Sequence, residues 1–323
     1  MKMTKNRVIG LLAGGAICLT ACISMGSKDV EKVMQERPVV SSMIVSPEIP
    51  ATVPFCGTLI DITRYNMREG FDREISTFSY LHATTMLYFK RANRYFPIIE
   101  PILKANGIPD DFKYLAVIES NLDPRIKSHA GAVGMWQLMP ATAREYGLHI
   151  TPTVDERCDV EKATAAACRY LKAAYAKYND WAAVASSYNA GMGRISGELN
   201  KQDADTTFDL WLVEETTRYV YRILAIKSIF ENPYKYGFIF QPRDLYKPIE
   251  CMEVAVSSDI MDLSDFAQKH GVTYADLRRF NPWLRDRKLH TGGRTYKLKV
   301  PLEKDLFYAT PNNYVHNPNW VVK

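Results

Sequence analysis

The run FKYLAVIESNLDP, residues Phe112 to Pro124, holds one glutamate, Glu119, among residues that otherwise suit a protein interior. Read at 3.6 residues per turn, its apolar positions leave hardly any polar face. A helix that is apolar nearly all round is normally a core helix. An ionised carboxylate there is costly, so Glu119 must find a partner, stay protonated, or reach solvent from a helix end. The run predicts a buried helix that stops at the proline, and it leaves these three alternatives open.

Helical patterns extend on both sides of this run. Upstream, a helical pattern begins at Arg68 with FDREISTFSYLHATTMLYFKRANRYF and continues with PIIEPILKANG, which Gly107 closes. Downstream helical segments are PATAREYG, DVEKATAAACRYLKAAYAKY, DWAAVASSYNAG and TTRYVYRILAIKSIFENP. Almost no alternating strand pattern occurs in this region. We therefore predict a mainly α fold, with one helical domain over residues 60–235.

The composition changes after Pro233. MEVAVS alternates and is rich in valine, LSDFAQKHG and TYADLRRFN have the pattern of two short helices, and TYKLKVP alternates again. This order predicts a small βααβ module over residues 246–302. The remaining residues, 303–323, are expected to be irregular.

The N-terminus has the features of an export signal. A basic start precedes VIGLLAGGAICL, an apolar segment too short to span a bilayer. It ends in LTAC, which resembles the bacterial lipoprotein signal, where cleavage precedes the cysteine that carries the lipid. We predict a signal peptide over residues 1–21, lipidation at Cys22 and an extended tether over 22–59. A plain secretory signal and an uncleaved membrane anchor are the alternatives.

The charge and composition of the chain argue against nucleic acid as a partner. The chain of 323 residues carries a formal charge of +5, is 47% hydrophobic and is 24% charged, as an ordinary globular protein is. Three of the basic residues lie in the predicted signal peptide, which has no acidic residue, so +5 − 3 leaves +2. That charge is too weak to indicate nucleic-acid binding, and no other block of basic residues occurs.

Four cysteines remain beyond the lipoprotein signal: Cys56, Cys158, Cys168 and Cys251. Cys158 and Cys168 lie ten residues apart in a helical pattern, a rise of ~15 Å. A disulfide needs Cα atoms within ~7 Å, which argues against that pairing. A bridge between Cys56 and Cys251 stays possible, and free buried thiols are preferred.

Residues 114–148, YLAVIESNLDPRIKSHAGAVGMWQLMPATAREYGL, resemble the catalytic core of lytic transglycosylases, enzymes that cleave the glycan of bacterial peptidoglycan. The resemblance covers the whole helical domain and is greatest to the membrane-bound D type. It implies a lysozyme-like fold for this domain. The family's marks occur in order as Glu119-Ser120, Gly134-Met135-Trp136-Gln137, Tyr188-Asn189, and Glu215-Thr216 with Tyr219.

The resemblance and the local sequence agree on Glu119. Cleavage of a glycosidic bond needs an acid that is still protonated near neutral pH. Apolar surroundings raise the pKa of a carboxyl group. Leu115, Ala116 and Leu122 lie about one helical turn from Glu119 and would provide such surroundings. We therefore predict Glu119 as the catalytic residue.

The resemblance also implies substrate-binding positions. Ser128 matches a serine that contacts the substrate N-acetyl group, and Gln137 and Met139 match residues that line the sugar subsites. Tyr188 matches a tyrosine whose hydroxyl approaches the N-acetyl group or the catalytic carboxyl. Three further residues match cleft or support positions: Asn189, Glu215 and Tyr219.

Other marked residues are expected to be structural. Ser120 and Trp136 are expected to pack, and Gly131 and Gly134 to allow a tight turn. The six histidines show no metal-ligand spacing, so neither a metal nor a cofactor is expected.

The resemblance implies a route with one carboxylate. Glu119 protonates the bond between N-acetylmuramic acid and N-acetylglucosamine and then deprotonates the C6 hydroxyl, which closes onto C1 as a 1,6-anhydro end. Most glycosidases use a second carboxylate, and Asp123 is the nearest one in sequence. A residue before proline favours extended geometry, so Asp123 is expected to form a turn. A hydrolytic muramidase that uses Asp123 and a catalytically silent scaffold that binds the cell wall are the alternatives.

The C-terminal module resembles a LysM domain, which binds N-acetylglucosamine chains. The usual Gly-Asp-Thr-Leu entry is replaced by Ser258-Asp259-Ile260-Met261, so glycan binding and a purely structural role both stay open. The expected partners are peptidoglycan glycan strands and, through the lipid, a membrane. The chain is expected to be a periplasmic monomer, anchored to the outer membrane.

Overall fold

The computed structural model describes residues 45–308 and 314–322. The predicted signal peptide, Cys22 and most of the predicted tether lie outside these residues. In the part of the chain that is described, no helix combines the length and the apolar character needed to cross a membrane. From Pro47 onward, the described residues belong to one compact unit.

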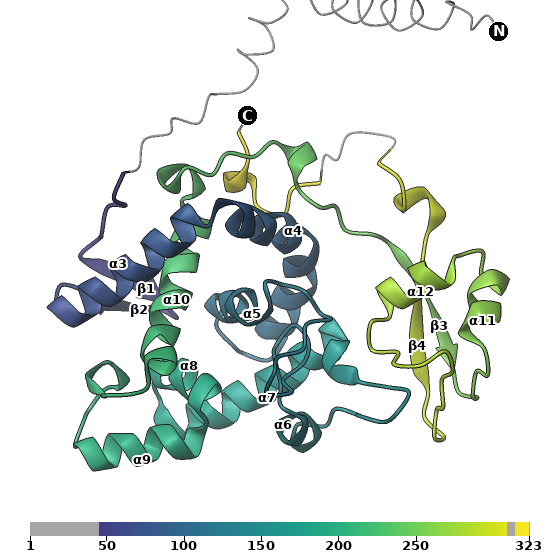
Figure 1. Cartoon of the computed structure of the whole chain (residues 1–323), viewed down its shortest axis with the longest axis horizontal. Coiled ribbons are helices and arrows are strands. Elements are labelled where there is room, and N and C mark those ends of the chain that lie inside the picture. The colour runs from purple at the N-terminus through teal and green to yellow at the C-terminus, as the bar shows by residue number, and fades with distance from the viewer. Residues whose placement is uncertain (1–44, 309–313, 323) are drawn as a thin grey trace, which may run out of the picture. The chain divides into compact units, whose positions relative to one another are not determined.

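The helical domain surrounds α5, the buried helix that carries Glu119. Figure 1 shows α5 in the middle of this domain, with α4, α7, α8 and α10 around it. The helices α4 and α10 pack directly against α5. A mainly helical fold is thus confirmed, although α9 was not among the predicted helices. The helices are α3 (Tyr65–Tyr80), α4 (His82–Ala105), α5 (Lys113–Ser120), α6 (Pro140–Glu145), α7 (Val160–Tyr178), α8 (Trp181–Ala190), α9 (Met192–Gln202) and α10 (Glu214–Glu231).

The last residues of the predicted tether fold instead into a β-hairpin. It consists of β1 (Thr52–Phe55) and β2 (Thr58–Asp61), paired antiparallel. Gly57 has a φ of +84° and forms part of the turn. Val53 and Phe55 are buried in the core of the helical domain. The hairpin forms here because alternating side chains give the strands one apolar face that the helices cover.

The C-terminal tail is irregular, yet it contributes to the core of the helical domain. The Trp320 side chain is buried, and its ring centroid lies 5.4 Å from that of Phe230 and 5.5 Å from that of Phe89. The Trp320 indole N–H donates to the carbonyl oxygen of Phe230 at 3.0 Å. The end of the chain therefore packs on α4 and α10, which sequence patterning did not predict.

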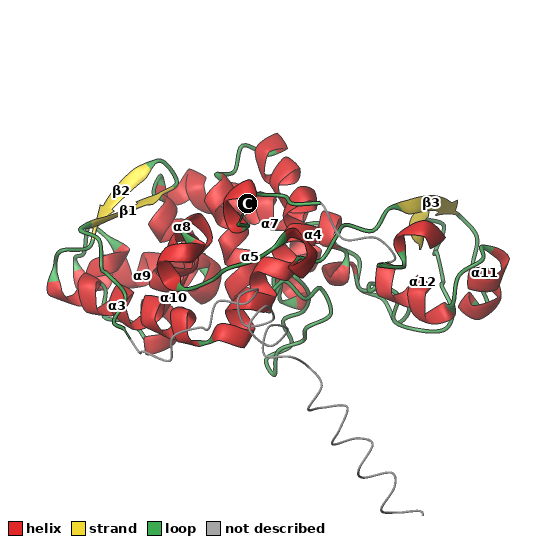
Figure 2. Cartoon of the chain, turned by 90° about the horizontal axis from the view of Figure 1, so that it is seen from above, coloured by secondary structure: helices red, strands yellow, loops and turns green. Residues whose placement is uncertain are grey.

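The predicted βααβ module is confirmed. Its elements are β3 (Cys251–Val256), α11 (Leu263–Lys269), α12 (Tyr274–Phe280) and β4 (Tyr296–Pro301). The two strands pair antiparallel, and Figure 2 shows β3 beside the two short helices.

The module shares a hydrophobic cluster with the helical domain. Val133, Val154 and Cys158 of that domain pack with apolar residues of the module, among them Trp283 and Leu284. Burial of these side chains on both sides stabilises the association of the two parts.

All four described cysteines are free thiols. Cys158 and Cys168 are buried, and Cys56 and Cys251 are half-buried. Burial raises the pKa of the Cys158 thiol to about 12 and that of Cys168 to about 11. These thiols therefore stay protonated and unreactive at neutral pH.

Candidate active site

The end of α5 fixes the position of Glu119. Helix α5 stops at Ser120 rather than at the proline, because Asn121 adopts the left-handed conformation with a φ of 55°. The Tyr88 hydroxyl donates to the Asn121 side-chain oxygen at 2.8 Å, and Arg91 donates to the Asn121 carbonyl at 2.8 Å. Both donors lie on α4, so that helix holds the C-terminal end of α5. Glu119 is consequently in a rigid last turn.

Glu119 has an environment that favours its protonated form. Most of α5 is buried, including Leu115 and Ala116, and Glu119 itself is half-buried. Burial raises the pKa of the Glu119 carboxyl to about 7, against an ordinary value of 4.5. A carboxyl group with this pKa can both donate and accept a proton near neutral pH.

Helix α10 brings three polar residues to Glu119. The Tyr219 hydroxyl donates a hydrogen bond to the Glu119 carboxylate, which lowers the pKa of Glu119. The positive charge of Arg222 lowers this pKa further, whereas the negative charge of Glu215 raises it. These effects are smaller than that of burial, so the pKa of Glu119 stays high.

Helix α8 provides Tyr188 and Asn189. The Tyr188 hydroxyl donates to the Trp136 carbonyl oxygen at 2.7 Å. Burial, with the charge of Glu119 next in importance, raises the pKa of Tyr188, so this tyrosine lies close to the Glu119 carboxyl. The Asn189 side-chain amide donates to Glu215 at 3.3 Å. The structure therefore joins the predicted residues of α5, α8 and α10 into one site.

The loop between α5 and α6 carries Ser128, Gln137 and Met139. The Ser128 hydroxyl accepts a hydrogen bond from the Ala132 backbone N–H at 3.0 Å. The Gln137 side-chain amide donates to the Gly134 carbonyl at 2.8 Å, so its nitrogen stabilises the loop. Met139 is 43% exposed, which leaves its side chain open to a ligand. No described contact joins any of the three directly to Glu119.

Gly134 is the residue on which the shape of this loop depends. Its φ is +87°, and a Cβ atom there would lie 1.8 Å from the Arg157 carbonyl oxygen. Only glycine permits both this conformation and this approach. Trp136 is fully buried and donates to the Thr164 hydroxyl at 2.8 Å, and Ser120 is buried and donates to the Ala116 carbonyl. Both residues pack, as expected from the sequence.

The Asp123 carboxylate is paired with two arginines, Arg125 and Arg91. It receives two hydrogen bonds from the Arg125 guanidinium, each of 3.0 Å, and forms an ion pair with Arg91 at 3.6 Å. Burial alone would raise the pKa of Asp123, but these hydrogen bonds and charges outweigh it and hold that pKa below its usual range. Asp123 therefore serves as the charged centre of a turn.

A pocket of about 450 Å³ adjoins the α10 face of the site. It shares Glu215 and Arg222 with the surroundings of Glu119. Its wall includes an ion pair, in which buried Glu74 of α3 accepts from half-buried Arg218 of α10 at 2.6 Å. The pocket has room for a sugar-sized ligand next to Glu215 and Arg222, and Glu119 is not among the residues that line it.

Sequence reasoning missed two residues here, Tyr88 and Arg222. Arg222 follows Tyr219 by three residues, so helical spacing alone places both on one face of α10. Tyr88 had no local signal, because its role depends on contact between α4 and the end of α5. Among the described residues, no group of three or more His, Cys, Asp or Glu side chains could hold a metal ion.

Comparison with known protein families identifies both parts of the chain. Residues 96–210 match the transglycosylase SLT domain, and residues 252–304 match the soluble lytic transglycosylase C-terminal LysM-like domain. The chain therefore contains a transglycosylase SLT domain followed by a LysM-like domain, as the sequence motifs predicted. This assignment agrees with the predicted lysozyme-like helical domain.

Curated relatives carry the same description. The membrane-bound lytic murein transglycosylase D of Escherichia coli K12 is 30% identical over 236 residues, which are 71% of this chain and 50% of that protein. The peptidoglycan transglycosylase gp16 of Escherichia phage T7 is 37% identical over 94 residues, 28% of this chain and 7% of that protein. The chain thus spans about half the length of the Escherichia coli relative.

A solved structure is also similar. The 70 kDa soluble lytic transglycosylase of Escherichia coli matches with a TM-score of 0.38 and 25% identity, over 44% of this chain and 24% of that chain.

Proposed function

We propose that this protein is a peptidoglycan lytic transglycosylase that cleaves the bond between N-acetylmuramic acid and N-acetylglucosamine without water. The observation that carries the proposal is the pKa of about 7 at Glu119, in a site that the transglycosylase SLT match covers in part. The names of the relatives point to the same activity.

Glu119 acts first as an acid and then as a base. Its protonated carboxyl donates to the leaving glycosidic oxygen, and the substrate's own N-acetyl group stabilises the cationic sugar. The resulting carboxylate removes the proton of the C6 hydroxyl, which attacks C1 and gives the 1,6-anhydro end. This attack is intramolecular, and it takes the place of the bimolecular attack by a water molecule that hydrolysis would need. Tyr219 orients the carboxyl for both proton transfers through its hydrogen bond.

The other residues of the site bind the sugars. Met139 offers an exposed apolar side chain to a ring face, and Gln137 offers its side-chain oxygen to a hydroxyl or an N–H group. The Asn189 side-chain amide is hydrogen-bonded to Glu215, and the Tyr188 hydroxyl is hydrogen-bonded to the Trp136 carbonyl, so both side chains are positioned near Glu119 for contact with a sugar. Ser128 contacts the N-acetyl group through its remaining hydroxyl proton.

The environment of Asp123 argues against a hydrolytic muramidase. A general base for water must lie beside the scissile bond and hold a free lone pair. Asp123 is bound by Arg125 and Arg91 instead, and its low pKa makes it a weak base. We therefore assign it no chemical role.

We further propose that Cys22 carries a lipid and that the chain is periplasmic and attached to the outer membrane. The description of a relative as membrane-bound agrees with this location. Labelling of cells with a fatty-acid analogue should mark the wild-type chain and leave the Cys22→Ala variant unmarked. Equal labelling of both would refute the lipid site.

Digestion of purified peptidoglycan sacculi tests the activity. The wild-type full-length chain and the Asp123→Asn variant should release soluble fragments, and Glu119→Gln should release none. Loss of activity in Asp123→Asn, with its thermal unfolding unchanged, would favour the hydrolytic mechanism. Wall binding without any release by the wild-type chain would favour the silent scaffold.

A further inference from the structure

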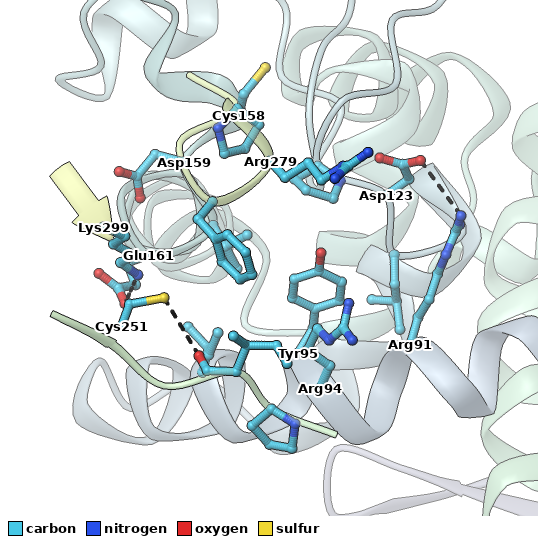
Figure 3. A pocket seen from close by; sticks show the side chains of 18 of the residues that line it. Arg91, Arg94, Tyr95, Asp123, Cys158, Asp159, Glu161, Cys251, Arg279 and Lys299 are labelled. Carbon is cyan, nitrogen blue, oxygen red and sulfur yellow. Dashed lines mark hydrogen bonds and ion pairs between the residues drawn. The ribbon is translucent and has the colours of Figure 1, made fainter. Parts of the chain in front are cut away.

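A second cavity, of about 600 Å³, lies away from Glu119, where the helical domain meets the LysM-like module. Helix α4 supplies one wall through Arg91, Arg94 and Tyr95. Strand β3, the end of α12 and strand β4 supply the opposite wall, and Figure 3 shows side chains from both parts around a common space.

The two walls are held in place by direct bonds. The Asp155 backbone N–H donates to the Trp283 carbonyl at 2.8 Å, and the Arg285 N–H donates to the Thr153 carbonyl at 2.9 Å. Lys299 of β4 bonds to Glu161 of α7 at 2.6 Å. Because these contacts connect the module to the helical domain, the cavity is a preformed feature of the fold.

One side of the cavity offers donors without partners. Figure 3 shows the Tyr95 hydroxyl directed into the open space, with Arg94 beside it. Tyr95 makes no hydrogen bond with any described residue, and burial raises its pKa while the nearby Arg94 lowers it. Arg94 donates through its Nε to the Lys247 carbonyl at 3.0 Å, and its guanidinium lies over the Tyr246 ring, 5.5 Å from the ring centroid. Its two terminal nitrogens make no hydrogen bond in the described part of the chain. Both residues are half-buried, and a hydrogen bond from such donors to a charged group is stronger than one to a neutral group, so this corner is suited to an anionic oxygen.

The other side offers acidic groups. One oxygen of Asp159 accepts from the Lys162 backbone N–H at 3.0 Å and caps α7, and its second oxygen has no hydrogen-bond donor among the described residues. Burial raises the pKa of Asp159, which a nearby cation would oppose. Glu161 also lines the cavity, but its carboxylate is already paired with Lys299 at 2.6 Å, so Asp159 is the acidic group left for a ligand. This side is suited to an ammonium group.

The basic and acidic residues that line the cavity are nearly equal in number, and most of the other lining residues are apolar. Five basic and four acidic residues line the cavity, so it suits neither a polyanion nor a simple cation. Its apolar surface comes from Pro97, Ile98, Pro248, Ile249, Phe280 and Trp283.

We propose that this cavity binds a short peptide that carries free carboxylates and an amino group, with a carboxylate at Tyr95 and Arg94 and the ammonium at Asp159. Its volume fits a few residues. The inference rests on the proposed function in one respect. Peptidoglycan glycan carries short peptides with both groups, so the peptide that the cavity meets is the stem peptide of the substrate.

Calorimetry with the full-length chain tests the proposal. The probe is the synthetic tripeptide alanyl-γ-glutamyl-diaminopimelic acid, and an N-acetylglucosamine tetramer serves as the comparison ligand. We expect saturable binding of the tripeptide and roughly tenfold weaker binding by Tyr95→Phe, which removes one hydrogen bond to a charged group. Arg94→Gln should weaken binding at least as much. The matched control is Arg287→Gln, an exposed arginine of the module outside the cavity, which should bind as the wild type does.

The proposal would be overturned by the absence of saturable tripeptide binding, or by binding that Tyr95→Phe and Arg94→Gln leave unchanged. Tyr95-dependent binding of the tetramer in place of the tripeptide would also overturn it and would make the cavity a glycan site. The tripeptide contains no glycosidic bond, so its binding does not depend on cleavage. A chain that binds the peptide but releases nothing from sacculi would refute the proposed function alone, and the reverse result would refute this inference alone.

Discussion

Replacement of Glu119 by glutamine should stabilise the protein, and the gain should grow with pH. Folding raises the pKa of this carboxyl from 4.5 to about 7. A raised pKa means that the folded state binds the proton more tightly, so the contribution of the protonated group is complete below pH 4.5 and is lost as the pH rises through 7. Glutamine does not titrate and avoids this loss.

The magnitude follows from the shift. One pKa unit corresponds to about 1.4 kcal/mol, so a shift of this size costs the wild type about 3 kcal/mol at pH 8 and about 1 kcal/mol at pH 5. The advantage of Glu119→Gln should therefore grow by about 2 kcal/mol between these two pH values. For a chain of this size that is a relative increase in Tm of roughly 4–8 °C.

Thermal unfolding of the full-length wild type and of Glu119→Gln at both pH values provides the assay. Glu69→Gln is the matched control, because Glu69 is an exposed glutamate of α3, and its effect should be the same at both. A difference between Glu119→Gln and the wild type that does not change with pH, or that falls as the pH rises, would refute the reasoning. It would mean that burial does not raise the pKa of this carboxyl.

Three further changes test the surroundings of the site. Tyr219→Phe removes the hydrogen bond that lowers the pKa of Glu119, so the alkaline limb of the kcat/KM profile should move up by about one pH unit. Glu215→Gln removes a negative charge that raises this pKa, so the same limb should move down, and a shift of both variants in one direction would contradict the assignment. Gly134→Ala should destabilise the protein by about 3 kcal/mol or more, measured by denaturant unfolding, because its Cβ would collide with a carbonyl oxygen. Gly131→Ala should cost less, because its Cβ would meet no atom within 4 Å, and equal losses would count against the close approach at Gly134.

The sequence predicted the features that depend on neighbours along the chain. The apolar run around Glu119 indicated a buried helix, and α5 is buried on nearly every side. Alternation and turn residues predicted the βααβ module in its correct order. The family resemblance pointed to Glu215 and Tyr219, which both lie on α10 and act on the pKa of Glu119.

Features that depend on contacts between distant segments could not be predicted in this way. Trp320 packs against Phe230, ninety residues earlier, and its local sequence gives no sign of burial. Tyr88 holds the end of α5 through Asn121, a contact set by how α4 and α5 pack. The hairpin over residues 52–61 was missed because its short alternation follows a proline-containing stretch that resembles a tether.

The central claim is that one carboxylate, Glu119, cleaves the glycan without water. Digestion of purified sacculi by the wild-type chain in isotopically heavy water, with mass spectrometry of the released fragments, tests it most directly. The fragments should have ends lighter by one water than reducing ends and without the heavy oxygen, and Glu119→Gln should release no fragments. Reducing ends that carry the heavy oxygen would contradict it and would show that water is the nucleophile.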